Sequence, residues 1–122
     1  MLLAWGLANV VQAWGLTLNP DEAYYWMYSK HLAWGYFDHP PAIALLIRLT
    51  SSWLGGELGV RLGVVLLQMV SFVLLWDLLG RPKERSRVLL LFALLAAQPF
   101  LHVYGFVATP DSPLLFGTVL FL

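Results

Sequence analysis

The sequence predicts an all-α membrane protein, a polytopic bundle of transmembrane helices, and its composition is the main reason. Hydrophobic residues make up 60% of the 122 residues and charged residues only 11%, whereas soluble domains have about 45–50% and about 25%. The mean hydropathy is +0.74. A soluble domain of this length has too much surface to keep so many apolar side chains away from water. We therefore expect lipid around most of the chain.

The apolar residues fall into four stretches that are candidate membrane spans: residues 1–18, 60–79, 88–107 and 113–122. A spanning helix needs about 20 apolar residues, so the last stretch predicts only part of a span. The chain is therefore expected to be the N-terminal part of a longer membrane domain. The first stretch can alternatively be read as a secretory signal peptide, but it lacks the basic start of such peptides. We interpret it as a membrane anchor.

Charged residues predict the orientation of these spans. The short segment 80–87 has a net charge of +3, whereas the long segment 19–59 has a net charge of −2. The positive-inside rule places segment 80–87 in the cytoplasm, together with the N-terminus, and segment 19–59 outside. The formal net charge of the whole chain is zero, so nothing in the charge indicates a nucleic-acid-binding surface. The absence of cysteine excludes thiol catalysis and thiolate metal sites.

The outer loop, residues 19–59, is long and aromatic enough to be an ordered functional segment. Asn19 and Pro20 predict the start of a helix, with an N-cap followed by proline at the first helical position. We expect this helix to cover residues 20–34 and, because of its aromatic side chains, to lie at the membrane interface. A second short helix is expected over residues 41–54.

Acidic residues from separate segments are expected on this same outer face: Asp21 with Glu22, Asp38, and Asp111. Each also has a plain structural interpretation. Asp21 and Glu22 can complement a helix dipole, Asp38 can belong to a surface turn, and Asp111 can cap the following helix. Together with His39, however, they can bind a hard divalent cation or take a proton from an incoming hydroxyl. Basic side chains that can balance a phosphate on this surface are Lys30, Arg48 and Arg61.

This combination suits group transfer from a lipid-linked phosphate donor, because such a reaction needs a stabilised anionic leaving group beside a membrane. Alternatives from other classes stay open: a transporter segment, a non-catalytic membrane subunit, or an inactive truncated fragment. A transporter would place acids deep within its spans or show an inverted repeat, whereas these acids lie at one end. Arg61 and Asp77, at the two ends of the second span, can alternatively be anchors at opposite membrane interfaces.

Three runs of residues carry a family resemblance: Asp-Glu-Ala-Tyr-Tyr-Trp from Asp21, Gly-Tyr-Phe-Asp-His-Pro-Pro from Gly35, and Ala-Thr-Pro-Asp-Ser-Pro from Ala108. In this order and spacing they resemble glycosyltransferases of the family 39/83 type. That group includes protein O-mannosyltransferases, lipid A aminoarabinose transferases and dolichyl-phosphate-mannose-mannosyltransferase-like proteins. With Gly-Val-Arg-Leu from Gly59, the resemblance covers essentially the whole chain. It implies a GT-C fold, in which a multi-pass helical enzyme transfers a sugar from a polyprenyl-phosphate carrier with inversion.

The resemblance also implies roles for single residues. Asp21 is expected to be the general base, with Glu22 and Asp111 as further catalytic acids. Asp38 matches a position linked to metal or donor binding, so a divalent cation (Mg, Mn or Zn) is the one cofactor expected there. His39 is expected to face the donor phosphate, although some relatives have lysine at this position. The remaining residues of the expected donor-binding set are Tyr24, Lys30 and Arg61.

Partners and location follow from the same resemblance. The expected activity is that of a hexosyl or pentosyl transferase that uses a polyprenyl-phosphate sugar. The acceptor hydroxyl is expected on a glycan, a lipid or a protein, with membrane lipid around the enzyme and no nucleic acid. The expected location is the plasma membrane, which in a bacterium is the inner membrane. Relatives are several-fold longer, so this chain alone is expected to be incomplete as an enzyme.

Overall fold

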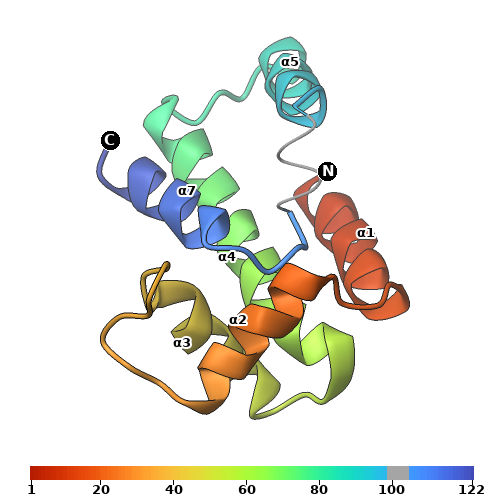
Figure 1. Cartoon of the computed structure of the whole chain (residues 1–122). Coiled ribbons are helices and arrows are strands. Elements are labelled where there is room, and N and C mark those ends of the chain that lie inside the picture. Colours follow the sequence, from red (N-terminus) through yellow and green to blue (C-terminus); the bar gives the residue numbers. More distant parts are fainter. Residues whose placement is uncertain (99–104) are drawn as a thin grey trace.

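A computed structural model describes residues 1–98 and 105–122, and these residues form helices and no strand (Figure 1). This confirms the all-α class for the described part of the chain. The helices, in chain order, are α1 (Leu2–Gly15), α2 (Pro20–Lys30), α3 (Ala42–Ser51), α4 (Gly56–Leu78), α5 (Arg85–Ala96) and α7 (Asp111–Leu120).

Helix α4 is the central element, and among the described residues it alone is long and apolar enough to cross a membrane. Its 23 residues correspond to about 34 Å of helix, against a hydrocarbon core of about 30 Å. It begins a few residues before the predicted span 60–79. Helices α1, α5 and α7 lie within or overlap the other predicted stretches but have only 14, 12 and 10 residues. Part of the third stretch, residues 99–104, lies outside the described residues. The multi-pass topology therefore stays a prediction.

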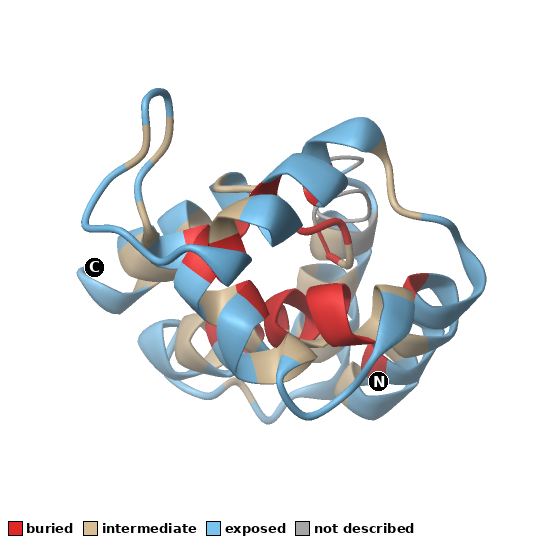
Figure 2. Ribbon diagram, turned by 60° about the horizontal axis from the view of Figure 1, so that its bottom comes forward, coloured by how far each residue is buried: buried red, intermediate tan, exposed pale blue. Residues whose placement is uncertain are grey.

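The other helices are arranged around α4. Helices α1, α3 and α7 pack against it, and α2 packs against α3. Figure 2 shows the buried positions gathered where the helices face one another, with the outer surfaces exposed. The segment 80–84 and α5 lie at the far end of α4 from α2 (Figure 1). The main core cluster consists of Tyr25, Ile43, Ile47, Val60, Val64 and Ala108.

Helix α2 begins where the sequence predicts. The side-chain oxygen of Asn19 accepts a hydrogen bond from the backbone N–H of Glu22 (2.9 Å), and the Glu22 carboxylate accepts one from the backbone N–H of Asn19 (3.0 Å). This reciprocal pair is a capping box, and Pro20 occupies the first helical turn. The plain interpretation of Glu22 as a residue that stabilises the helix start is thus confirmed.

The end of α2 differs from the prediction, because the helix stops at Lys30 instead of continuing to residue 34. The hydroxyl of Tyr36 lies 3.0 Å from the carbonyl oxygen of Tyr28 and 3.1 Å from that of His31, so it can donate to either. Carbonyls at a helix end need such partners. A side chain from the following loop therefore completes the end of α2, which local sequence signals did not indicate. Helix α3 likewise ends at Ser51, before the predicted residue 54.

Two glycines of α4 allow α3 to approach closely. A Cβ atom on Gly59 would collide with the backbone carbonyl of Leu54, and one on Gly63 would lie 2.8 Å from the Cγ atom of Leu46. The first neighbour is backbone and cannot move aside as a flexible side chain can. Glycine at position 59 is therefore required by the tight connection between α3 and α4.

Candidate functional site

A pocket of about 420 Å³ lies where the first turns of α2 and α7 meet the loop before α3. We call it the acidic pocket. Its lining residues are Asn19, Asp21, Tyr25, His39, Val107, Thr109, Pro110 and Asp111. The structure thus brings together Asp21, His39 and Asp111, which come from three separate segments, as the sequence predicts for one end of the membrane domain.

Asp111 is the first residue of α7, and Pro110, not Asp111, occupies the N-cap position. Within the described part of the chain, no side-chain hydrogen bond caps this helix. The interpretation of Asp111 as a helix cap is therefore wrong. Its carboxylate is an exposed group in the lining of the acidic pocket.

Tyr25 is the member of the acidic pocket that the sequence interpretation missed. Its side chain is 7% exposed, its hydroxyl lies 2.9 Å from Nε2 of His39, and the two rings meet edge to face. Burial raises the pKa of Tyr25, and the negative charges of Asp21, Asp38 and Asp111 raise it further. The hydroxyl therefore keeps its proton and can donate a hydrogen bond to Nε2 of His39 in the tautomer that leaves this nitrogen without a proton. The four-residue spacing from Asp21, which puts both side chains on one helix face, was the available signal.

Asp38 lies beside the acidic pocket in a cluster of tyrosines. Its carboxylate accepts hydrogen bonds from the hydroxyls of Tyr28 (2.9 Å) and Tyr24 (3.3 Å), and lies 3.6 Å from Nε2 of His39. Partial burial raises the pKa of Asp38, but the bond from Tyr28, the nearby His39 and the bond from Tyr24 outweigh it, so the net pKa is lowered. Asp38 is therefore held as an anion next to His39.

The metal-binding expectation for Asp38 has no supporting ligand set in the part of the chain that the structure describes. No three His, Asp or Glu side chains there are grouped closely enough to hold a metal ion. The oxygens of Asp38 instead accept hydrogen bonds from tyrosine hydroxyls. The donor atoms present thus fit hydrogen bonding, and the divalent cation stays a prediction.

Glu22 lies behind the acidic pocket and is fully buried, with an exposed fraction of 0%. Arg61, on α4, donates from Nε to Oε1 of Glu22 (2.7 Å) and from Nη2 to Oε2 (2.6 Å). The backbone N–H of Ala108 donates to the same carboxylate at 2.9 Å. One carboxylate therefore joins the start of α2 to α4 and to the segment that leads to Asp111.

Burial and charge act in opposite directions on Glu22. Burial alone raises its pKa, but hydrogen bonds from Arg61, Ala108 and Asn19, with the positive charge of Arg61, lower it overall. Glu22 is therefore an anion that is fully occupied by its partners. This favours a structural role, and its expected role as a catalytic acid gains no support from the geometry.

The hydrogen-bonding groups of Arg61 are likewise all used within the protein. Its remaining N–H groups donate to the backbone carbonyls at the end of α1, those of Ala13 (3.2 Å), Leu16 (2.6 Å) and Thr17 (2.9 Å). A guanidinium has five N–H groups, and each of them has an acceptor here. The side chain is 2% exposed, so the interpretation as an interfacial anchor is wrong. The expected contact with a donor phosphate would require breaking one of these bonds.

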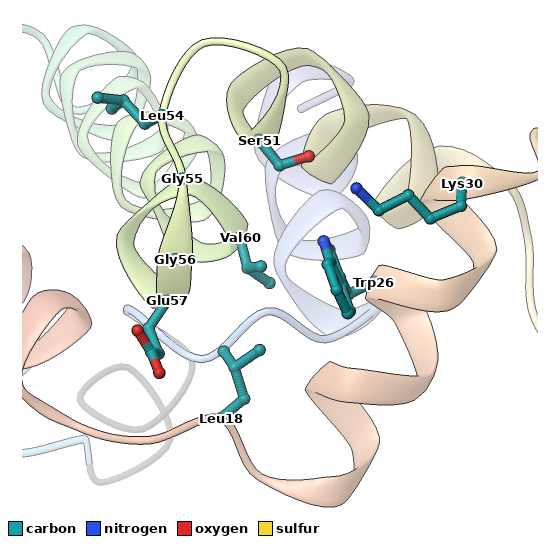
Figure 3. Close-up of a pocket in the computed structure, with 9 residues that line it drawn as sticks. All are labelled: Leu18, Trp26, Lys30, Ser51, Leu54, Gly55, Gly56, Glu57 and Val60. Carbon is teal, nitrogen blue, oxygen red and sulfur yellow. The ribbon is translucent and has the colours of Figure 1, made fainter.

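Lys30 lies in a different pocket, of about 280 Å³, which we call the lysine pocket. Figure 3 shows its ammonium group directed across the pocket toward the end of α3, with Glu57 at the opposite side. Nζ lies 4.7 Å from the ring centre of Trp26, a distance suited to a cation–π contact. Neither Lys30 nor Arg61 lines the acidic pocket. Tyr24 does not line the acidic pocket either, but its ring centre lies 5.8 Å from that of Tyr25 and its hydroxyl donates to Asp38.

Comparison with known proteins identifies a family. Residues 38–122 match the model of the dolichyl-phosphate-mannose-protein mannosyltransferase family. The match covers more than half of the chain and includes Asp38, His39 and Asp111, whereas Asp21 lies before it. No curated protein and no solved structure matched the chain. The chain therefore belongs to the dolichyl-phosphate-mannose-protein mannosyltransferase family, a family of membrane-bound glycosyltransferases of the GT-C kind.

Proposed function

We propose that the chain contributes the acidic pocket of a glycosyltransferase that moves a sugar from a polyprenyl-phosphate carrier to an acceptor hydroxyl. The observation that carries this proposal is the convergence of Asp21, His39 and Asp111 on one pocket. The family match supports the donor class, because the family is described by its use of dolichyl-phosphate mannose. Mannose is therefore the first sugar to test, and a protein hydroxyl is the first acceptor.

Asp21 acts as the general base in this proposal. Its exposed carboxylate, at the start of α2, takes the proton of the acceptor hydroxyl. The acceptor oxygen then attacks the anomeric carbon, and the bond between that carbon and the phosphate oxygen breaks with its electron pair on the phosphate. Attack on the face opposite the leaving group inverts the configuration. Asp111, which also lines the pocket, positions the acceptor or the sugar by accepting hydrogen bonds from its hydroxyl groups.

His39 stabilises the leaving phosphate. Its Nε2 lies between the hydroxyl of Tyr25 (2.9 Å) and the carboxylate of Asp38 (3.6 Å). An N–H group of the imidazole can donate a hydrogen bond to a phosphate oxygen. Asp38 and Tyr25 thus hold the ring in place beside Asp21. No step of this proposal requires a metal ion.

The proposed setting is a plasma membrane, with segment 80–87 in the cytoplasm and the acidic pocket outside. The basic segment 80–87 and α2 lie at opposite ends of α4 (Figure 1), in agreement with the charge rule. In this setting a lipid-linked donor reaches the pocket from the outer leaflet.

A donor panel tests the proposal. The complete gene product, in vesicles, would be offered polyprenyl-phosphate mannose, polyprenyl-phosphate aminoarabinose and a nucleotide sugar, each with a peptide or glycan acceptor. We expect transfer from one of the polyprenyl-phosphate donors and inverted configuration in the product. Transfer only from the nucleotide sugar, or retention of configuration, would contradict the proposal.

A further inference from the structure

An apolar groove of about 410 Å³ lies between the loop that follows α2 and the exposed face of α3. Its lining residues are Leu32, Ala33, Trp34, Pro41, Ala42 and Leu45. None of these side chains is ionisable, and Leu45 is 50% exposed. The groove therefore suits an uncharged, flexible hydrocarbon and offers no side-chain charge for a polar ligand.

The groove adjoins the acidic pocket through the chain itself. Pro41 lines the groove and His39 lines the acidic pocket, and two residues of extended chain span at most about 7 Å. The backbone N–H of Tyr36 donates to the carbonyl of His39 at 3.1 Å, which closes the loop at this point. Figure 1 shows this loop leaving the end of α2 and swinging outward before α3 begins. A ligand with a charged end at His39 can thus extend an apolar chain into the groove.

The packing of α3 on α4 sets the depth of the groove in a membrane. Leu46 of α3 lies against Gly63 of α4, and Gly63 is about 10 Å along the helix from Gly56. If α4 crosses the bilayer, α3 therefore lies at the level of the outer acyl chains. Trp34, which also lines the groove, is 100% exposed, as expected for an aromatic residue at the lipid–water boundary.

We propose that the apolar groove binds the first isoprene units of the lipid carrier whose phosphate faces His39. This inference rests on the proposed function and adds the place at which the carrier chain is held. The carrier has a charged phosphate head and an uncharged chain. In the same order, the acidic pocket with its charged and polar side chains adjoins the uncharged apolar groove. By binding the hydrocarbon chain of the carrier, the groove selects the donor by its lipid, whichever sugar the donor carries.

Two leucines on α3 provide a matched test. Leu45 lines the groove and Leu49 lies one helical turn further along, outside the groove lining, with exposed fractions of 50% and 58%. Leu45→Gln and Leu49→Gln in the complete gene product would be assayed with two sugar donors, one with a long polyprenyl-phosphate chain and one with a methyl phosphate that has no isoprene chain. We expect Leu45→Gln to raise the KM for the long-chain donor about threefold to tenfold, the loss that one or two methylene contacts predict. Its KM for the donor without an isoprene chain is expected to change less.

Leu49→Gln is expected to leave both KM values unchanged. Equal effects of the two substitutions, or no effect of Leu45→Gln with normal transfer, would overturn the groove assignment. A long-chain polyprenyl phosphate with a diazirine on its first isoprene unit gives an independent readout, because we expect the label within residues 32–45. Labelling elsewhere, or equal labelling of the groove by a photoreactive phospholipid, would also overturn it. Absence of transfer from every polyprenyl-phosphate donor would instead contradict the proposed function.

Discussion

Arg61 and Glu22, 39 positions apart in the sequence, form a buried ion pair with two hydrogen bonds, one of 2.7 Å and one of 2.6 Å. The pair joins α2 to α4, and Ala108 binds the same carboxylate. Arg61 is about 8 Å along α4 from its first residue, where an unpaired cation in a membrane would be costly. The acidic pocket is therefore assembled on a structural ion pair behind it.

Removing one partner of this pair should destabilise the protein strongly. We expect Arg61→Met to lower the free energy of unfolding by about 3–5 kcal/mol, because it leaves the Glu22 carboxylate buried without its cation. The double variant Glu22→Gln, Arg61→Met should be less affected than Arg61→Met alone. Thermal unfolding of the purified protein in detergent measures both.

The exposed Arg48 of α3 provides the control for that series. Arg48→Met should change the free energy of unfolding by less than about 0.5 kcal/mol. An effect of Arg48→Met as large as that of Arg61→Met would show that loss of any arginine is harmful. That outcome would contradict the structural role of the ion pair.

The stability should also depend on pH through Glu22. Its pKa is lowered in the folded protein from an ordinary value of 4.5, so the folded state gains stability above that pH and loses it as the pH falls through the folded pKa. We expect the free energy of unfolding to fall between about pH 5 and about pH 3, and to fall less steeply in Glu22→Gln. Equal slopes for wild type and Glu22→Gln would contradict this assignment.

Gly59 should not tolerate a side chain. Gly59→Ala places a methyl group against the backbone carbonyl of Leu54, and we expect a loss of about 1–3 kcal/mol in the free energy of unfolding. Gly117→Ala in α7 is the matched control, because a Cβ there meets no atom within 4 Å. Higher helix propensity should make Gly117→Ala neutral or stabilising by up to about 1 kcal/mol. Similar losses in the free energy of unfolding of both variants would contradict the close approach of α3 and α4.

Tyr25 should matter for catalysis through His39. Tyr25→Phe removes the hydroxyl that lies 2.9 Å from Nε2, and we expect kcat to fall about threefold to tenfold, the worth of one hydrogen bond. Tyr36→Phe, a tyrosine outside the acidic pocket, should keep the wild-type kcat. An unchanged kcat in Tyr25→Phe would remove Tyr25 from the site.

Local signals in the sequence predicted the local structure. Asn19 and Pro20 mark the start of α2 because an N-cap acts within one turn. The apolar run in α4 predicts a span because length and hydropathy are properties of a single segment. Charge asymmetry placed Asp21, His39 and Asp111 at one end of the domain, and the pocket brings them together.

Long-range contacts were beyond these signals. In the sequence, Glu22 is one of two acidic residues at a helix start. Nothing near it in the sequence indicates that it forms an ion pair with Arg61. Lys30 was grouped with Arg61 and His39 as a phosphate partner, but helical geometry directs it to the lysine pocket. Tyr25 belongs to the aromatic helix that the sequence predicts at the membrane interface, although its side chain lies in the core. In each case the contact depends on tertiary packing.

Sugar transfer by an Asp21→Asn variant of the complete gene product tests the central claim most directly. The change removes the proton acceptor but keeps the size of the side chain, and Glu57→Gln is the control, because Glu57 does not line the acidic pocket. We expect Asp21→Asn to insert into the membrane normally and to lose at least about a hundredfold in the rate of transfer from the polyprenyl-phosphate donor, with Glu57→Gln near wild type. Normal transfer by Asp21→Asn would contradict the assignment of Asp21 as the general base.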